Sequence, residues 1–378
     1  MSSDTADAVI VGGGIVGAAC ADVLSREGLS VMIVEAGVVG GGATAAGMGH
    51  VVVMDDSEAE FALTRYSWQL WQRLAAALPT EAEYQPSGTI WVAADEEEFA
   101  AVIRKQQYYE ERAVRAEALD AEALRDAEPH LRPGLAGGLL VQDDSVVYAP
   151  CVTNWLVRQA ESRGAVLRAG TRVVELTGKT VKLEDGSKLS AGFTVNAAGA
   201  WAPELTAGLP IRPRKGHLAI TDRYPGFVRH QLVELGYLKS AHGAAAESVA
   251  FNAQPRSTGQ VLIGSSRQFG VESSTVDRPL LGKMIRRAIE YMPELAELAT
   301  IRTWTGFRAA TDDKLPLIGP HAAIPGLYLA TGHEGLGITT SLGTARLLAD
   351  QILGREPAIP VDAYLPSRFG SGDGPLVG

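Results

Sequence analysis

The stretch Ala-Val-Ile-Val-Gly-Gly-Gly-Ile-Val-Gly, residues 8–17, decides the fold of the first part of the chain. Residues 8–11 are a short apolar run, which is typical of a buried strand. The glycines that follow have the spacing G-x-G-x-x-G, and a helical pattern begins among them and ends at Gly28. A second apolar run, residues 30–34, leads to Glu35. The order strand, helix, strand predicts a parallel βαβ unit.

Each glycine of this motif has a physical role beside a dinucleotide. Gly12 permits a tight turn, Gly14 lets a pyrophosphate approach the backbone, and Gly17 lets the helix pack closely on the strand. The helix N-terminus supplies N–H donors and partial positive charge to the phosphates. Glu35 lies about 20 residues further on, where a ribose contact is expected. We therefore predict a dinucleotide site. A glycine-rich structural turn is the alternative, and the motif alone does not separate FAD from NAD.

The size and charge of the chain exclude several classes of protein. Its 378 residues suggest two or three domains, and 46% hydrophobic with 21% charged residues is a globular composition. A net charge of −10 argues against a protein that binds nucleic acid or an anionic membrane. With only Cys20 and Cys151, and no histidine pair at metal-ligand spacing, we expect no metal site. No run approaches the roughly 18 apolar residues of a membrane span, and the polar N-terminus lacks signal features, so we expect a cytoplasmic protein.

Strand–turn–helix patterns recur around residues 193–201 and 326–353, with different material between them. Residues 95–131 have a charged helical pattern, and residues 206–304 alternate strands with loops, as in an antiparallel sheet. We predict an α/β protein with a discontinuous Rossmann-like nucleotide-binding domain and an inserted α+β domain on an antiparallel sheet. The expected boundaries are 1–50, 140–205 and 305–365 for the first domain, 51–139 and 206–304 for the second, and 366–378 for a flexible tail.

Four segments carry a likeness to a known family: residues 9–17, VNAAGAW at 195–201, GFR at 306–308 with residues 313–319, and GHEGLG at 332–337. Together they resemble the D-amino-acid oxidase family of flavoproteins, which includes glycine oxidase, sarcosine oxidase and D-proline or D-hydroxyproline dehydrogenases. The resemblance covers essentially the whole chain in order. It implies FAD rather than NAD, and hydride transfer from the α-carbon of a small amino acid to flavin N5, which gives an imine. The substrate would be a D-amino acid or a cyclic or secondary amine such as D-proline or D-hydroxyproline, and the acceptor would be oxygen, a quinone or a partner redox subunit.

The resemblance also implies roles for individual side chains. Arg308 would pair with the substrate carboxylate, because a guanidinium binds a carboxylate at two points and fixes its orientation. A structural salt bridge from Arg308 to Asp312 or Asp313 is the alternative. His333 precedes the last helix, where it would assist the helix N-terminus at the flavin or act as an ordinary turn residue.

Further candidates lie along the cofactor and the substrate pocket. Val173 or Val174 would contact the adenine through its backbone. His50 and Tyr237 would face the substrate pocket, or equally be core or rim residues. The residues expected to contact FAD are Gly12, Gly14, Ile15, Val16, Gly17, Glu35, Ala36, Thr44, Ala45, Gly47, Met48, Gly49, Val173, Val174, Ala198, Gly199, Trp201, Gly306, Arg308, Gly332, His333, Gly335, Leu336, Gly337 and Ile338.

The cysteine positions bear on how the cofactor is held. Monomeric sarcosine oxidase and its close relatives attach FAD through a cysteine in their C-terminal portion. No cysteine follows Cys151 here, so we expect non-covalent FAD. Two other functions stay open: an FAD-dependent 2-hydroxy-acid dehydrogenase with the same carboxylate clamp, and the flavin subunit of a multi-subunit amine dehydrogenase.

Overall fold

The structure, a computed structural model, describes residues 4–236 and 247–370. The chain divides into two compact units, each made of separate stretches of sequence. Unit 1 comprises Met1–Ala82, Tyr148–Pro213 and Phe307–Gly378, and unit 2 comprises Glu83–Val147 and Arg214–Gly306. The predicted α/β class, a Rossmann-like part with a second part on a largely antiparallel sheet, is confirmed.

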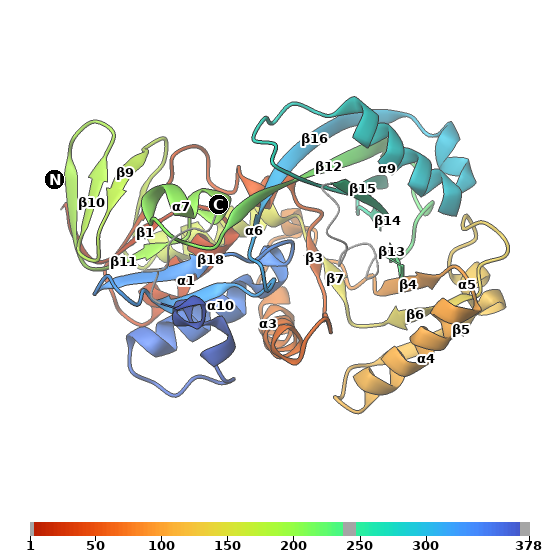
Figure 1. The fold of residues 1–378 in the computed structure, drawn as a ribbon, viewed down its shortest axis with the longest axis horizontal. Helices are drawn as coiled ribbons and strands as arrows, with labels where there is room; N and C mark the ends of the chain where they lie inside the picture. Colours follow the sequence, from red (N-terminus) through yellow and green to blue (C-terminus); the bar gives the residue numbers. More distant parts are fainter. Residues whose placement is uncertain (1–3, 237–246, 371–378) are drawn as a thin grey trace. The chain divides into compact units, whose positions relative to one another are not determined.

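Unit 1 is built on a mainly parallel sheet of strand order β17-β18-β11-β1-β2-β8 (Figure 1). Strands β18, β11, β1, β2 and β8 are parallel, and β17 runs antiparallel to β18. Strand β2 is buried along its whole length and β1 over its last four residues, as is typical of the central strands of a parallel sheet that is covered on both faces. Strands β9 and β10 form a hairpin, and β10 pairs antiparallel with β11. The strands of unit 1 in this sheet are β1 (Thr5–Val11), β2 (Val31–Val34), β8 (Val166–Arg168), β9 (Val173–Leu176), β10 (Thr180–Leu183), β11 (Lys188–Asn196), β17 (Leu317–Pro320) and β18 (Leu327–Thr331).

The long helices of unit 1 pack on one another, α1 against α6 and α10, and α10 against α3. Trp71 of α3 is fully buried, and its Nε1 donates to the carbonyl of Thr339 in α10 at 2.9 Å. This packing groups α3 with unit 1, whereas the sequence placed residues 51–82 in the inserted domain. The assignment of FAD binding to one domain and substrate binding to the other stays a prediction. The remaining elements of unit 1 are α1 (Ile15–Arg26), α2 (Ala43–Ala46), β3 (His50–Val51), α3 (Glu58–Ala75), η1 (Thr80–Ala82), α6 (Ala149–Glu161), η2 (Gly199–Trp201), α7 (Ala202–Leu205), α10 (Gly337–Ile352), η4 (Asp362–Tyr364) and η5 (Pro366–Phe369).

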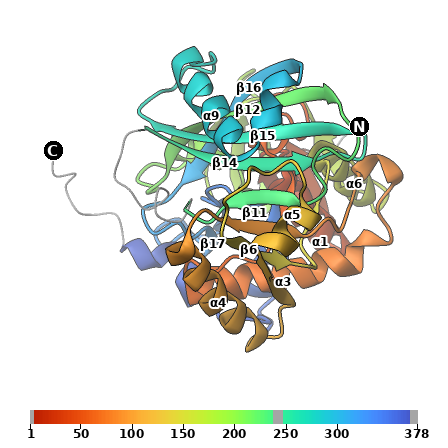
Figure 2. The same cartoon turned by 90° about the vertical axis from the view of Figure 1, so that its right-hand side faces the viewer.

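Unit 2 contains a sheet of order β16-β12-β15-β14-β13-β4-β6-β5, in which β13 and β4 are parallel (Figure 1). Helix α9 packs on β14 and β15 (Figure 2). The elements are β4 (Thr89–Ala93), α4 (Glu96–Glu110), β5 (Ala116–Asp120), α5 (Ala121–Ala127), β6 (Gly137–Val141), β7 (Ser145–Val146), β12 (Arg212–Arg223), β13 (Gln231–Glu234), β14 (Glu247–Pro255), β15 (Gln260–Phe269), α9 (Arg278–Tyr291), η3 (Pro293–Glu297) and β16 (Thr300–Ala310).

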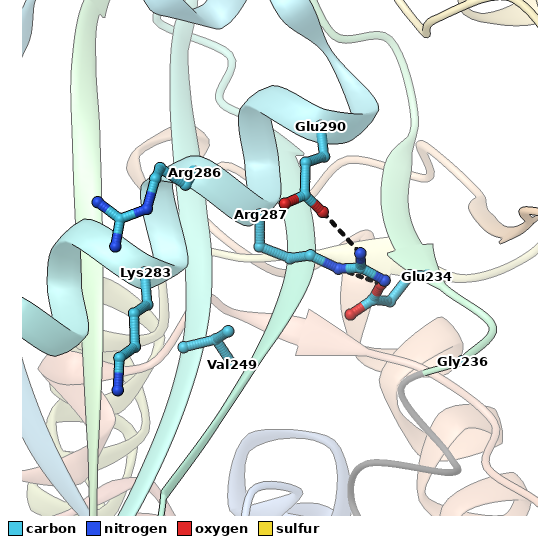
Figure 3. Close-up of a pocket in the computed structure, with 7 residues that line it drawn as sticks. All are labelled: Glu234, Gly236, Val249, Lys283, Arg286, Arg287 and Glu290. Atoms are coloured by element: carbon cyan, nitrogen blue, oxygen red, sulfur yellow. Dashed lines mark hydrogen bonds and ion pairs between the residues drawn. The ribbon is translucent and has the colours of Figure 1, made fainter.

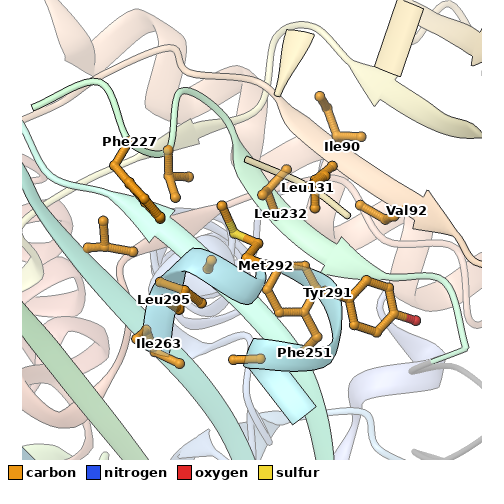
Figure 4. Packing of buried hydrophobic residues seen from close by; sticks show 14 of the residues in the cluster. Ile90, Val92, Leu131, Phe227, Leu232, Phe251, Ile263, Tyr291, Met292 and Leu295 are labelled. Atoms are coloured by element: carbon orange, nitrogen blue, oxygen red, sulfur yellow. The ribbon is translucent and has the colours of Figure 1, made fainter. Parts of the chain in front are cut away.

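The core of unit 2 lies between its sheet and α9. Phe251 of β14 stacks on Tyr291 of α9 with ring centroids 4.6 Å apart, and Met292 and Leu295 close the end of the same cluster (Figure 4). The charged stretch 95–131 is not one helical segment, because β5 interrupts it and pairs with β6. The helical expectation holds for α4 and α5 but is wrong at residues 116–120, because β5 is an edge strand and its exposed face allows charged side chains.

The last residues of unit 1 bear on the expected tail, 366–378. Pro366–Phe369 form a 3₁₀ helix, and residues 371–378 lie outside the described part of the chain.

Candidate cofactor site

The first glycine turn is too tight for any other residue at two of its positions. Gly12 has φ of +114°, and a Cβ there would lie 2.4 Å from the carbonyl oxygen of Ala197. A Cβ on Gly17 would lie 2.0 Å from the carbonyl oxygen of Gly12. Strand β1, the turn and helix α1 therefore approach as closely as the motif predicts.

The N-terminus of α1 is open on the side of Gly14. Gly14 is the N-cap residue and has no side chain with which to cap the helix. A Cβ there would meet only Thr44 Oγ1, at 3.4 Å, and this oxygen accepts a hydrogen bond from the Ile15 N–H at 3.1 Å. A helix N-terminus whose N-cap residue has no side chain, with free space beside it, fits a phosphate group.

Glu35 lies at the carboxyl end of β2 with its carboxylate held by the backbone. Its Oε2 accepts from the Gly13 N–H at 2.6 Å and its Oε1 from the Gly37 N–H at 2.7 Å. A carboxylate has about four acceptor positions, so two remain for ribose hydroxyls. The Thr171 N–H donates to the Glu35 carbonyl at 2.9 Å, which brings the start of β9 to this end of the sheet. At that start Val173 is buried and Val174 is exposed, as is Ala36 beside Glu35.

Residues 44–50 lie along the beginning of α10. A Cβ on Gly47 would lie 3.0 Å from Ile338 Cδ1, and Thr339 Oγ1 donates to the His50 carbonyl at 2.9 Å. Within this stretch Met48 is buried and Gly49 has φ of +96°. The stretch rich in small residues is thus a packed part of unit 1, beside the last glycine turn.

Residues 195–201 lie at the same end of the sheet as the first glycine turn. The Ala197 N–H donates to the Val11 carbonyl at 2.8 Å, and Thr331 Oγ1 donates to the Gly199 carbonyl at 3.0 Å. Ala198 precedes the 3₁₀ helix that carries Trp201, whose half-exposed ring lies 5.6 Å from the ring of Phe307. Segments more than a hundred residues apart in sequence therefore meet where the parallel strands end, which is where ligands bind in open α/β sheets.

Arg308 lies on β16 beside the last glycine turn. The Glu334 N–H donates to the Ala309 carbonyl at 2.9 Å, and a Cβ on Gly335 would lie 3.7 Å from Arg308 Nε. Helix α10 begins two residues later, with Leu336 as an N-cap residue that offers no side-chain cap. A guanidinium beside an uncapped helix N-terminus favours binding of negative charge.

The alternative partners of Arg308 each pair with another arginine. Asp312 pairs with Arg212 at 2.5 Å, and Asp313 pairs with Arg368 at 2.6 Å.

His333 is buried in the turn before α10. Its Nε2 lies 2.9 Å from Thr344 Oγ1, and burial lowers the pKa of His333 to about 3. The imidazole is therefore neutral, and the geometry favours its role in holding the turn. Of the other expected residues, Gly306 is the last residue of unit 2, and Tyr237 lies outside the described residues.

These observations fit a dinucleotide such as FAD. One end of the unit 1 sheet presents two uncapped helix N-termini, a glycine turn open at Gly14 and a carboxylate at the end of β2. Sequence reasoning listed Thr44 as an FAD contact but did not place its hydroxyl at the α1 N-terminus, and it did not single out the Ala197 backbone that lies against Gly12. Both contacts depend on how distant chain segments are placed, which the local sequence does not indicate.

Unit 2 has a buried polar surface that the sequence did not indicate. Thr89 and Gln231 are neighbours on paired strands, and Asn252 lies opposite Val233 on the next strand. Thr89 Oγ1, Trp91 Nε1, Gln231 Oε1 and Asn252 Oδ1 are buried and have no hydrogen-bond partner among the described residues. Because buried polar atoms without partners are rare, we expect water or a polar ligand to contact this face of the sheet.

A pocket of about 440 Å³ opens on α9 in unit 2, lined by the charged side chains of Lys283, Arg286, Arg287, Glu290 and Glu234 (Figure 3). Arg287 bridges Glu234 at 2.5 Å and Glu290 at 2.7 Å. Among the residues that the structure describes, none of those predicted to bind the cofactor or to be catalytic lines this pocket. Its wall is formed mainly by charged side chains of unit 2, three of which are joined in ion pairs.

The described residues contain neither a cluster of metal-ligating side chains nor a membrane-spanning helix. Within 4–236 and 247–370, no three His, Cys, Asp or Glu side chains come together to hold a metal ion. No helix in this part of the chain has the length and apolar character needed to cross a bilayer.

Glu60, near the start of α3, is expected to make the stability of the fold depend on pH. Burial, then the neighbouring Asp56 carboxylate, raises the pKa of Glu60 from 4.5 to about 7. Since the pKa is higher in the folded state, its contribution to stability is full below pH 4.5 and is lost as the pH rises through 7. In the Glu60→Gln variant, the free energy of unfolding relative to the wild type should therefore rise by roughly 2 kcal/mol between pH 5 and pH 8. Urea unfolding at the two pH values measures this change.

The control is Glu58→Gln, at an exposed position in the first turn of the same helix. Its stability curve should run parallel to that of the wild type. If the Glu60→Gln curve also runs parallel, burial does not raise the pKa of Glu60.

Comparison with known proteins places these features in context. The sequence model of the family described as FAD dependent oxidoreductase matches residues 7–351. The chain is 29% identical over 423 residues to hydrogen cyanide synthase subunit HcnC of Pseudomonas aeruginosa, covering 97% of this chain and 96% of that protein. It is 28% identical over 322 residues to D-amino acid dehydrogenase of Methylobacterium nodulans, covering 81% of this chain and 73% of that protein. The crystal structure of glycine oxidase from Geobacillus kaustophilus is similar with a TM-score of 0.87 at 27% identity, covering 96% of this chain and 99% of that one.

Proposed function

Since the chain belongs to the FAD dependent oxidoreductase family, we propose that it is an FAD-dependent enzyme that oxidises the C–N bond of a small amino acid. Its relatives include a glycine oxidase and a D-amino acid dehydrogenase. The observation that carries the proposal is the position of Arg308 beside the Gly335 turn and the uncapped N-terminus of α10. A guanidinium group beside this glycine turn, where the flavin is proposed to bind, supports a substrate that bears a carboxylate.

Each part of the site has a proposed task. The turn at Gly12 and Gly14 with the N-terminus of α1 binds the pyrophosphate, and Glu35 binds the adenosine ribose. Arg308 holds the substrate carboxylate at two points, which aims the α-carbon and leaves the neutral amine free to drive the reaction with its lone pair. Bound FAD supplies the acceptor for the hydride from the α-carbon, and the product is an imine. The N-terminus of α10 stabilises negative charge that develops on the cofactor side of the site.

We propose that FAD is held without a covalent cysteine link. Cys20 is buried in α1, where burial raises its pKa to about 12, and a thiol of this kind is unreactive. Cys151 lies in the first turn of α6. Acid precipitation of the purified protein should therefore release its FAD into the supernatant, measured by absorbance. Yellow colour that stays in the pellet would contradict this prediction, and a Cys151→Ala variant would then show whether that thiol forms the link.

A substrate panel tests the proposed reaction. The FAD-loaded protein is mixed without oxygen with glycine, sarcosine, L-proline, D-proline, D-hydroxyproline and other D-amino acids, and with 2-hydroxy acids as the rival class. Bleaching of the flavin by an amino acid or cyclic amine supports the proposal. Bleaching by 2-hydroxy acids alone would assign the site to the rival class. Re-oxidation by oxygen, a quinone or a dye then separates oxidase from dehydrogenase.

The assembly of the protein is a related question, because one relative is a subunit of hydrogen cyanide synthase. A purified chain that is reduced by its substrate and passes electrons to a dye, but not to oxygen, would support a partner redox subunit.

A further inference from the structure

We propose that Arg368, in the last 3₁₀ helix, is a positioning residue: it fixes the turn 311–316 and through this turn holds Arg308 in place for the substrate carboxylate. The inference rests on the proposed role of Arg308. It concerns a residue sixty positions further along the chain, in a segment that the sequence patterns predict as a flexible tail.

Arg368 makes an unusually complete set of contacts for a residue near the end of the described chain. Its Nε and NH2 donate to the two carboxylate oxygens of Asp313 at 2.6 and 3.1 Å. Its remaining donors reach the backbone carbonyls of Leu315 at 2.7 Å, Pro316 at 3.0 Å and Leu365 at 3.3 Å. Only 14% of the side chain is exposed. A guanidinium that is bound at two points to a carboxylate and also to carbonyls has little freedom to move.

The turn that Arg368 binds connects β16, which carries Arg308, to β17. Its own hydrogen bonds are short-range: Thr311 Oγ1 donates to the Leu315 carbonyl at 2.9 Å, and the Leu315 N–H donates to Asp313 Oδ1 at 3.1 Å. Burial raises the pKa of Asp313, but hydrogen bonds and charge from Arg368 outweigh burial and hold that pKa below its usual value. Asp313 therefore stays ionised and paired at neutral pH.

The same turn lies against the glycine turn that faces the proposed substrate. A Cβ on Gly332 would lie 2.9 Å from Thr311 Cγ2, and the next residues of that turn bond to β16 through the Glu334 N–H and the Ala309 carbonyl. Movement of Thr311 would therefore shift both β16, which carries Arg308, and the glycine turn that lies beside Arg308. A displacement of about 1 Å in a substrate-binding group can cost a factor of 100 in rate.

The two residues that directly precede the 3₁₀ helix of Arg368, Tyr364 and Leu365, are anchored on unit 1. The hydroxyl of Tyr364, which is 1% exposed as a residue, donates to the Ala59 carbonyl at the start of α3 at 2.7 Å. Leu365 Cδ2 lies 3.0 Å from the position that a Cβ on Gly319 of β17 would occupy. Arg368 therefore acts from a fixed support rather than from a free chain end.

The neighbouring ion pair provides a matched control. Asp312, in the same turn, pairs with Arg212 at 2.5 Å, but these two side chains are 69% and 66% exposed. An exposed pair contributes little, so Arg212→Ala removes an arginine of β12 that contacts the same turn without loosening the turn.

The test compares Arg368→Ala, Arg368→Lys and Arg212→Ala in the FAD-loaded protein, with the amino acid that reduces the wild-type flavin fastest. Arg368→Ala should lower kcat/KM by roughly 10- to 100-fold, mostly through KM, with FAD content unchanged. Arg368→Lys should lie between Arg368→Ala and the wild type, and Arg212→Ala should match the wild type. In hydrogen exchange, which does not depend on activity, peptides that cover residues 306–316 should exchange faster in Arg368→Ala.

A double variant separates this inference from the proposed function. Added to Arg308→Ala, the Arg368→Ala change should cause no further loss in KM, because it acts through Arg308. Full additivity, or a lower melting temperature with KM as in Arg212→Ala, would overturn the positioning role and leave the proposed function intact. An Arg308→Ala variant with wild-type KM would instead overturn the proposed function. Should Arg368→Ala not fold, Asp313→Asn weakens the same contact and is expected to raise KM.

Discussion

Replacing Arg308 by alanine is expected to lower kcat/KM for the amino-acid substrate by roughly 100-fold or more, while the flavin spectrum stays nearly unchanged. The expectation follows from the loss of a charge-assisted, two-point contact worth about 3 kcal/mol, where each 1.4 kcal/mol is a factor of ten. Arg308→Lys should recover only part of the loss, since an ammonium group cannot reproduce the planar fork of a guanidinium. Stopped-flow reduction of the flavin without oxygen gives the rates directly.

The control for this prediction lies in the substrate. Amines without a carboxylate should be poor substrates of the wild type and should lose little further rate in Arg308→Ala. If Arg308 is a structural bridge, the alanine variant should instead lose thermal stability and FAD together and discriminate carboxylates as before.

The second large effect is expected at Gly14. A Cβ there would meet only Thr44 Oγ1 at 3.4 Å, and the residue has φ of −71°, so Gly14→Ala should fold. The added methyl would occupy the space through which a phosphate approaches the N-terminus of α1. We therefore expect FAD affinity to fall by roughly 100-fold, the equivalent of losing one or two hydrogen bonds to a charged group. The FAD-to-protein ratio after dialysis and the melting temperature of the apoprotein measure the two effects separately.

Alanine variants of two further glycines provide comparisons for Gly14→Ala. Gly12→Ala should lose stability as well as FAD, because its Cβ would lie 2.4 Å from the Ala197 carbonyl oxygen. Gly282→Ala, in α9, should keep full FAD content, since its Cβ would approach only Arg286 NH1, at 3.5 Å. Full flavin occupancy in Gly14→Ala would mean that the motif is a structural turn and does not bind the phosphates.

The sequence predicted best where local chemistry determines the structure. The spacing of Gly12, Gly14 and Gly17 predicted a strand, turn and helix, and Gly12 and Gly17 lie where no Cβ fits. It predicted poorly where the contact depends on a distant partner. Helix α3 is amphipathic in either unit, and it is assigned to unit 1 by its packing on α10, which includes the contacts of Trp71 with Thr339 and of Ser67 with Thr340.

The C-terminal segment is a second case of the same limit. Small and polar residues near a chain end are typical of a flexible tail. Arg368 is bound because Asp313 and two carbonyls of one turn converge on it, and no pattern in residues 366–369 indicates that turn. For His333 the sequence left an active-site role and a turn role open, and its burial and its contact with Thr344 favour the turn role.

Anaerobic reduction of the bound FAD by an amino acid, with analysis of the product, tests the central claim most directly. The claim predicts that one flavin is bleached for each amino acid consumed, that the imine appears as its hydrolysis product, a 2-oxo acid, or as a cyclic imine, and that deuterium on the α-carbon slows the bleaching. A protein that holds FAD but is bleached by 2-hydroxy acids and by no amino acid or cyclic amine would contradict it.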